Sequence, residues 1–167
     1  MNTFLKQLIT DSKNRKIKIF FDMDGVCAEE ICDPYDAELV KNNEEDFYFK
    51  KRPIKTIIKV MRKLNKQPNI EVCVLSSCDY ENQAEQKRSW LKIHIPFIDI
   101  NKAYFVVWEN VNCKEDERPV QKAKVMERVN RDFDGDTYLI EDRHSTIIAT
   151  NNYFGKPIAF DMTRFIP

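Results

Sequence analysis

The sequence predicts an α/β fold, a doubly wound, Rossmann-like parallel sheet of five strands. Three observations lead to this fold class. Short apolar runs recur along the chain, helix-like patterns lie between them, and the length of 167 residues is that of one compact domain. Strands that are buried on both faces read as continuous apolar runs, and parallel strands need a connecting segment that is usually a helix.

Five segments are expected to form the strands. Each is a short apolar run with polar or turn-forming residues on either side. Each therefore fits a strand that is buried on both faces of the sheet. They are residues 16–21, 70–75, 103–108, 137–140 and 157–160.

Helices are expected between these strands. The first begins at Pro53, a residue suited to the first turn of a helix. The apolar residues that follow at helical spacing are Ile54, Ile57, Ile58, Met61 and Leu64. Further helices are expected over residues 81–92 and 119–131, and a short one over 145–151. This alternation places the ligand site beyond the carboxyl ends of the strands, where the strand order reverses.

Residues 28–49 interrupt the alternation. They carry eight acidic residues against one lysine and follow the first strand directly, where an active-site loop would lie. We interpret them as a small cap or lid insertion within a single domain of residues 1–167. A solvated acidic surface loop explains the same charges equally well.

Charge and composition exclude several classes of protein. Lys and Arg together number 27, as do Asp and Glu, so no long-range field draws the chain toward nucleic acid or a membrane. No segment has the apolar run of a signal peptide or of a membrane span. The five cysteines are odd in number and form no CxxC pair, so we expect reduced thiols in a cytoplasmic protein.

Two carboxylates follow the first predicted strand. Asp22 and Asp24 stand one residue apart, and Gly25 permits a sharp turn immediately after them. At the carboxyl end of a strand both side chains reach the ligand crevice. Two like charges so close are costly unless a cation or a shared proton holds them. An aspartate turn or helix cap is the structural alternative.

Polar residues also follow two other predicted strands. The second strand runs into Ser76 and Ser77, whose hydroxyls could donate to an anionic oxygen, although such serines are more often helix caps. The fourth strand ends in Glu141 and Asp142. Carboxylates and hydroxyls therefore converge on one edge of the sheet.

This convergence indicates a hard cation and a phosphate ligand. Carboxylates around one point suit Mg2+, the usual ion where a substrate carries phosphate. Phosphate also calls for a fixed cationic side chain, and Lys122 lies in the first turns of the helix that precedes the fourth strand. Lys124 and Lys114 are the competing lysines, and a solvated helix lysine is the structural alternative.

The ordered motifs resemble the haloacid dehalogenase (HAD) superfamily of phosphotransferases. The four parts are the D-M-D-G-V sequence at residues 22–26, Ser76, Lys122, and the pair Glu141 and Asp142. The resemblance spans nearly the whole chain, from about residue 17 to residue 161. It implies a HAD-like fold with a small insertion after the first strand.

The resemblance also implies a mechanism for hydrolysing phosphate monoesters. Asp22 would attack phosphorus to form an aspartyl-phosphate, and Asp24 would protonate the leaving oxygen and then deprotonate water. Asp22, the main-chain carbonyl of Asp24, and Asp142 would hold Mg2+, with help from Glu141. The side chains expected to bind the phosphate oxygens are Ser76, Ser77 and Lys122.

Three functions stay open. The residues around the motifs are similar to the small 5'-nucleotidase or deoxyribonucleotidase-like group, which implies a small phosphate ester, specifically a nucleotide, as substrate. A similarity of Asp142-Arg143 and of Pro34-Tyr35-Asp36 to the phosphatase domain of polynucleotide kinases implies nucleic-acid 3'-end processing instead. Eight basic residues without an intervening acid between positions 50 and 66 could bind a phosphate backbone, or form the solvated face of a helix. A phosphate-binding protein without catalysis is the third, and the oligomeric state is left open.

Overall fold

A five-stranded parallel sheet forms the centre of the molecule. The structure is a computed structural model that describes residues 2–30 and 47–166. The strands are β1 (Ile17–Phe21), β2 (Ile70–Cys78), β3 (Ala103–Val107), β4 (Asp136–Glu141) and β5 (Ala159–Asp161). Their order is β3-β2-β1-β4-β5, and every adjacent pair is parallel. The doubly wound α/β fold predicted from the sequence is confirmed.

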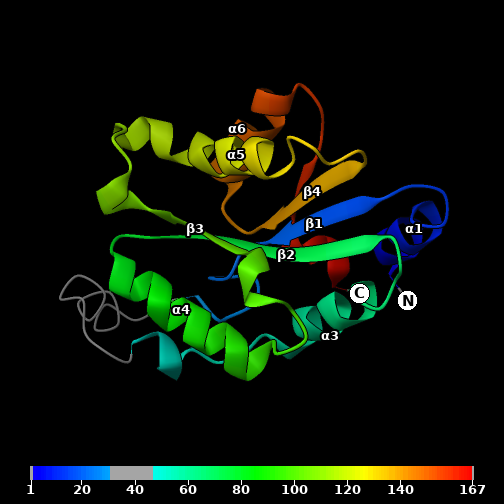
Figure 1. Cartoon of the computed structure of the whole chain (residues 1–167), viewed down its shortest axis with the longest axis horizontal. Helices are drawn as coiled ribbons and strands as arrows, with labels where there is room; N and C mark the ends of the chain where they lie inside the picture. The colour runs from blue at the N-terminus through cyan, green and yellow to red at the C-terminus, as the bar shows by residue number, and fades with distance from the viewer. Residues whose placement is uncertain (1, 31–46, 167) are drawn as a thin grey trace.

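Helices cover both faces of this sheet. α3 (Lys55–Leu64) and α4 (Glu81–His94) lie below it in Figure 1, whereas α5 (Arg118–Val129) and α6 (His144–Phe154) lie above it. The chain moves from β1 to β2 and β3 in one direction and to β4 and β5 in the other, so the order reverses beside β1. The carboxyl end of β1 therefore opens onto the crevice where ligands bind in such sheets.

Alternate residues of β1 pack into two separate cores. Ile19 and Phe21 belong to the larger core, which includes Leu64 of α3 and Trp90 of α4. Phe20 points to the opposite face and packs in the core beneath α5 and α6. Both faces of β1 are buried, which explains why its sequence is apolar except for Lys18, whose ammonium pairs with Glu71 at 3.2 Å.

An N-terminal helix is present that the sequence pattern did not predict. α1 (Thr3–Asp11) is capped by Asn2, whose side-chain oxygen accepts hydrogen bonds from the backbone N–H groups of Phe4 and Leu5. Leu5 and Leu8 enter the larger core. The Asn2 side chain also donates to the carbonyl of Ile166, so the two ends of the described chain lie together (Figure 1).

The element boundaries differ from those expected, most of all for β2. Its apolar run stops at Leu75, but its pairing with β3 continues to Cys78 opposite Val107, so Ser76 and Ser77 lie inside the strand rather than after it. Other boundaries move by one to three residues, and the short helix expected at 145–151 extends to 144–154. No helix in the described ranges is both long and apolar enough to cross a membrane.

Candidate active site

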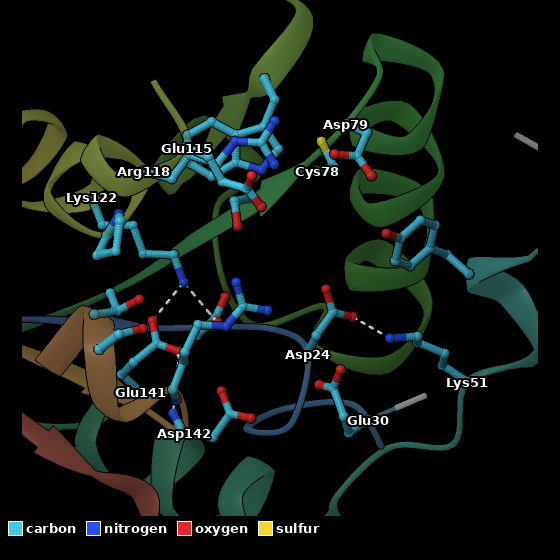
Figure 2. A pocket seen from close by; sticks show the side chains of 18 residues that line it. Asp24, Glu30, Lys51, Cys78, Asp79, Glu115, Arg118, Lys122, Glu141 and Asp142 are labelled. Carbon is cyan, nitrogen blue, oxygen red and sulfur yellow. Dashed lines mark hydrogen bonds and ion pairs between the residues drawn. The ribbon is translucent and has the colours of Figure 1, made fainter. Parts of the chain in front are cut away.

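The carboxyl ends of β1, β2 and β4 line one cavity of about 410 Å³. Asp22 follows β1, Ser77 belongs to β2, and Glu141 and Asp142 stand at the end of β4. Lys122 reaches the same cavity from α5 (Figure 2). The sequence motifs therefore meet at one place, as the sheet topology requires. Ser76 is the exception among them, because it does not line the cavity.

Asp22 is a buried carboxylate with bonds to both of its oxygens. Oδ1 accepts a hydrogen bond of 2.7 Å from the backbone N–H of Met23, and Oδ2 lies 2.7 Å from the ammonium of Lys122. Burial, followed by the nearby charge of Glu141, raises the pKa of Asp22 to about 6 despite the opposing effect of Lys122. Asp22 is thus a carboxylate that further positive charge would stabilise.

Lys122 joins Asp22 to Glu141. Its ammonium lies 2.6 Å from Oε2 of Glu141, while Oε1 of Glu141 accepts from the backbone N–H groups of Asp142 and Arg143. Burial alone would lower the pKa of Lys122, but Asp22 and Glu141 outweigh it and raise that pKa. Lys122 is therefore held as a cation against the floor of the cavity. Its competitor Lys124 is exposed and does not line the cavity.

Three carboxylates could hold a divalent cation here. Asp22, Glu141 and Asp142 each offer an oxygen, and these oxygens lie within 4.8 Å of one another. The donor set is all oxygen, which suits Mg2+. Burial, followed by the charge of Asp22, raises the pKa of Asp142, the one carboxylate of the three that Lys122 does not contact. The residues present therefore fit a magnesium ion.

Gly25 allows the Asp142 carboxylate to approach the loop after β1. Its φ angle of 72° lies in the left-handed region, and a Cβ at this position would stand 2.0 Å from Oδ2 of Asp142. A side chain would therefore strain the backbone and displace the carboxylate. This explains physically why the D-M-D motif is followed by glycine.

Asp24 lies between two ammonium groups. Lys51 is 2.5 Å from Oδ1 and Lys87 is 2.5 Å from Oδ2. Burial would raise the pKa of Asp24, but the charges of Lys87 and Lys51 outweigh it and lower the pKa to about 2. Asp24 is thus held as a carboxylate, the form that can accept a proton from water. The sequence reasoning missed both lysines.

Lys87 also fixes the serine that the sequence singled out. Its ammonium donates to Oγ of Ser76 at 2.9 Å and to the carbonyl of Ser77 at 2.6 Å. With its bond to Asp24, Lys87 uses its three N–H groups, and its side chain is fully buried. Ser76 therefore faces α4, whereas Ser77 faces the cavity.

Two hydrogen bonds attach the segment that carries Lys51 to α4. The backbone N–H of Tyr48, in the short 3-10 helix η1 (Tyr48–Lys50), donates to the Gln86 side chain at 3.2 Å. The indole N–H of Trp90 donates to the carbonyl of Lys51 at 2.8 Å. A further backbone bond of 2.8 Å links the N–H of Ile54 to the carbonyl of Cys27, in the loop after β1. Lys51 is therefore fixed beside Asp24.

An aromatic and basic wall closes another side of the cavity. Trp108 follows β3, and the guanidinium of Arg118 lies 5.0 Å from the centre of its indole ring. Both residues line the cavity, as does Arg143. Aromatic residues next to buried strands usually belong to the core. Trp108 does pack partly against the core beneath α5 and α6, and it is half-buried with one part facing the site.

The basic run between residues 50 and 66 does not form one surface at the site. Lys51 is buried and lies against Asp24. Among the described residues, it is the one member of the run that lines the cavity. Arg52 pairs with Glu29 at 2.9 Å. The basic residues of α3 are exposed, and Lys66 borders a different hollow near the amino ends of β1 and β2. The four basic residues of α3 thus form a solvated helix face.

The expected lid at residues 28–49 lies largely outside the described residues, which exclude 31–46. Its two ends are described. Glu30 lines the cavity at one end, and Tyr48 does so at the other.

Solved structures of known proteins share this fold. No family model matches the chain, and no curated protein matches its sequence. The HAD domain of the effector protein Lem4 from Legionella pneumophila is 15% identical, with a TM-score of 0.52 over 87% of this chain and 84% of that one. The class C acid phosphatase from Bacillus anthracis is 15% identical, with a TM-score of 0.55 over 98% of this chain and 80% of that one.

A third similar structure is a chain of the Pnkp1/Rnl/Hen1 complex. It is 15% identical, with a TM-score of 0.58 over 89% of this chain. The aligned part is 46% of that chain, so the present chain spans less than half of its length. The sheet order, the helices on both faces and these likenesses together show that the chain has the α/β fold of HAD domains.

Proposed function

We propose that the protein is a Mg2+-dependent phosphatase that hydrolyses phosphate monoesters through an aspartyl-phosphate on Asp22. One observation carries this proposal. Asp22 lines a cavity at the switch point of the sheet and is bonded to a buried lysine, with two further carboxylates beside it. A nucleophile, a fixed cation and a set of oxygen ligands are what phosphoryl transfer to a carboxylate requires.

The chain's own residues divide the work of the reaction. Asp22 forms the bond to phosphorus, and Lys122 neutralises charge on the transferring group while it holds Asp22 in place. Ser77, which faces the cavity, donates to a phosphate oxygen, whereas Ser76 acts through Lys87. The Asp24 carboxylate accepts a proton from the water that hydrolyses the intermediate and passes it to the leaving oxygen.

Asp22, Asp142 and the main-chain carbonyl of Asp24 would hold the magnesium ion. Glu141 has less freedom, because Lys122 and two backbone N–H groups already occupy its oxygens. When bound, Mg2+ would offset the repulsion between the carboxylate nucleophile and the anionic phosphate.

For the substrate we propose nucleoside monophosphates. A cavity of about 410 Å³ is of the size that takes a small ligand. The exposed guanidinium of Arg118, which rests on Trp108, offers a flat cationic surface on which a base can stack. Nucleic-acid 3'-end processing is the weaker candidate, because the exposed basic residues of α3 lie away from the cavity.

The test is phosphate release, with and without Mg2+, from nucleoside 5'- and 3'-monophosphates, a 3'-phosphorylated oligonucleotide and an aryl phosphate. We expect Mg2+-dependent release with a preference for mononucleotides. Asp22→Asn should abolish it, and Asp79→Asn, which alters another carboxylate of the same cavity, should retain it. A preference for the oligonucleotide would favour end processing. No release from any compound would leave phosphate binding without catalysis.

A further inference from the structure

The two lysines on Asp24 differ in their access to the cavity. Lys87 is fully buried and its three N–H groups are all used, by Asp24, Ser76 and the Ser77 carbonyl. Lys51 lines the cavity, and Asp24 is its one hydrogen-bond partner within residues 2–30 and 47–166. Within those ranges no protein atom uses the other N–H groups of Lys51, which can therefore donate to a ligand, whereas Lys87 has no N–H group left.

Lys51 is also a fixed cation. Its side chain is 6% exposed, and its ammonium lies 5.3 Å from the ring centre of Tyr48. Trp90 and Gln86 of α4 hold the backbone on either side of it. An ammonium that is already ordered loses little entropy when it meets a ligand, and it interacts strongly because little water surrounds it.

The position of Lys51 relative to Asp22 indicates which ligand atom it meets. Figure 2 shows Lys122, Glu141 and Asp142 on one side of the cavity, and Asp24 with Lys51 on the other. In phosphoryl transfer the attacking and leaving oxygens lie roughly in line on opposite sides of phosphorus. Asp22 is bonded to Lys122, so it attacks from the side of the cavity that holds Lys122. The leaving oxygen is therefore directed toward the side that holds Asp24 and Lys51.

We propose that Lys51 is a further catalytic residue, which donates a hydrogen bond to the leaving oxygen and stabilises the negative charge that develops there. This inference rests on the proposed phosphatase activity. An oxygen of Asp22 forms a bond to phosphorus as the bond between phosphorus and the ester oxygen breaks. The electron pair of the broken bond stays on the ester oxygen, which Lys51 contacts until the Asp24 carboxylate accepts a proton from a water molecule and passes it to that oxygen. The hydroxide that remains attacks phosphorus, breaks its bond to Asp22 and releases phosphate.

This role names a class of substrate. Esters of aliphatic alcohols, including the sugar hydroxyl of a nucleotide, leave as strongly basic oxygens and need such stabilisation. Aryl phosphates leave as weakly basic oxygens and need it little. The site is therefore built for alkyl phosphates, and Lys51 is the residue that extends its activity to them.

The test compares kcat/KM across a series of aryl and alkyl phosphates of increasing leaving-group basicity. Lys51→Met should lower the value for alkyl esters by about 100-fold, the usual effect of losing one such donor, and that for p-nitrophenyl phosphate by less than about threefold. Lys51→Arg should restore most of the loss. Lys50→Met is the matched control, because Lys50 is exposed and does not line the cavity.

Asp24 keeps its bond to Lys87 in the Lys51→Met variant, so the fold should survive, and its thermal unfolding is measured in parallel. An equal loss across all leaving groups, no loss, or no recovery with Lys51→Arg would each overturn the inference while the phosphatase activity stands. A wild-type protein that hydrolyses none of the series would overturn the proposed function itself.

Discussion

Paired charges determine what each residue of the site can do. Lys122 holds Asp22 and Glu141 at the floor of the cavity, while Lys51 and Lys87 hold Asp24 on its side. Each of these ammonium groups is buried, so the loss of one leaves a carboxylate in a place with little water. Substitutions here are expected to change both stability and activity, and matched controls are needed to separate the two effects.

Removing Lys122 should show most clearly that one residue supports both stability and activity. In Lys122→Met, Asp22 and Glu141 would face each other without a cation, and we expect the free energy of unfolding to fall by about 3 kcal/mol. Chemical denaturation measures this loss. Added Mg2+ should recover part of it, because the ion supplies positive charge to the same carboxylates. Lys124→Met changes an exposed lysine of the same helix and should leave both stability and activity near those of the wild type.

Gly25 offers a second test at the level of one residue. Gly25→Ala places a methyl group against the Asp142 carboxylate at a positive φ, so Mg2+ binding measured by calorimetry should weaken at least about tenfold, as with other disturbed ligand positions. Gly155→Ala has a similar φ of 63° but open space around the new methyl group. It should cost about 1 kcal/mol of stability and leave Mg2+ binding unchanged. Equal Mg2+ affinity in the two variants would contradict the role of Asp142.

Secondary-structure elements bring to the site residues that no single strand end carries. α4 supplies Lys87 and Trp90 three positions apart, on its inner face, and it fixes the η1 segment that presents Lys51. Trp108, directly after β3, and Arg118 of α5 stand at the rim. The cavity thus has one wall that positions the ammonium groups of Lys51 and Lys87, and another wall where Trp108 and Arg118 offer a flat surface to the substrate.

The two tryptophans should respond differently to substitution. Trp90→Phe removes the indole N–H that donates a hydrogen bond to the Lys51 carbonyl. The buried carbonyl loses this partner, so the free energy of unfolding should fall by about 1–3 kcal/mol. Trp108→Ala removes the support beneath Arg118 at the rim and should raise KM for mononucleotides with little effect on an aryl phosphate. Thermal unfolding and steady-state kinetics on both variants check this contrast. A raised KM in Trp90→Phe together with a loss of stability in Trp108→Ala would contradict the roles given to the two tryptophans.

The whole molecule gathers the site because parallel strands end at one edge of the sheet. Asp22, Ser77, Glu141 and Asp142 could be predicted from the sequence because each stands at or next to a strand end, where topology alone brings them together. The five-stranded fold followed from the same apolar runs. The apolar pattern predicts too short a β2, because it stops at the serines while the pairing of β2 with β3 continues to Cys78.

Other features depend on contacts that the strand pattern does not mark. Lys51 and Lys87 lie far from Asp24 in the chain, and in sequence each resembles an ordinary solvated lysine. Lys87 does share the inner face of α4 with Ala84 and Trp90, and a lysine on such a face is a usable signal of a buried partner. α1 is hard to predict because Leu5 and Leu8 are its only two buried residues, too short an apolar pattern to mark a helix.

Binding of Mg2+ should stabilise the whole fold, because its proposed ligands come from the ends of β1 and β4, two strands that are distant in sequence. At a concentration about 100 times its dissociation constant, the ion should add about 2.7 kcal/mol to the free energy of unfolding. Removal by a chelator should reverse the gain. Asp142→Asn should show much less of it, whereas Asp161→Asn, at the end of the edge strand β5, should show all of it.

The most direct test of the account is to look for the phosphorylated enzyme. The protein is mixed with a good substrate and Mg2+, quenched in acid within one turnover, and digested, and the peptide that contains Asp22 is weighed. The account predicts an increase by one phosphoryl group on Asp22 in the wild type and none in Asp22→Asn. Turnover with no phosphoryl group on Asp22 at any quench time, or a phosphoryl group on another residue, would contradict it.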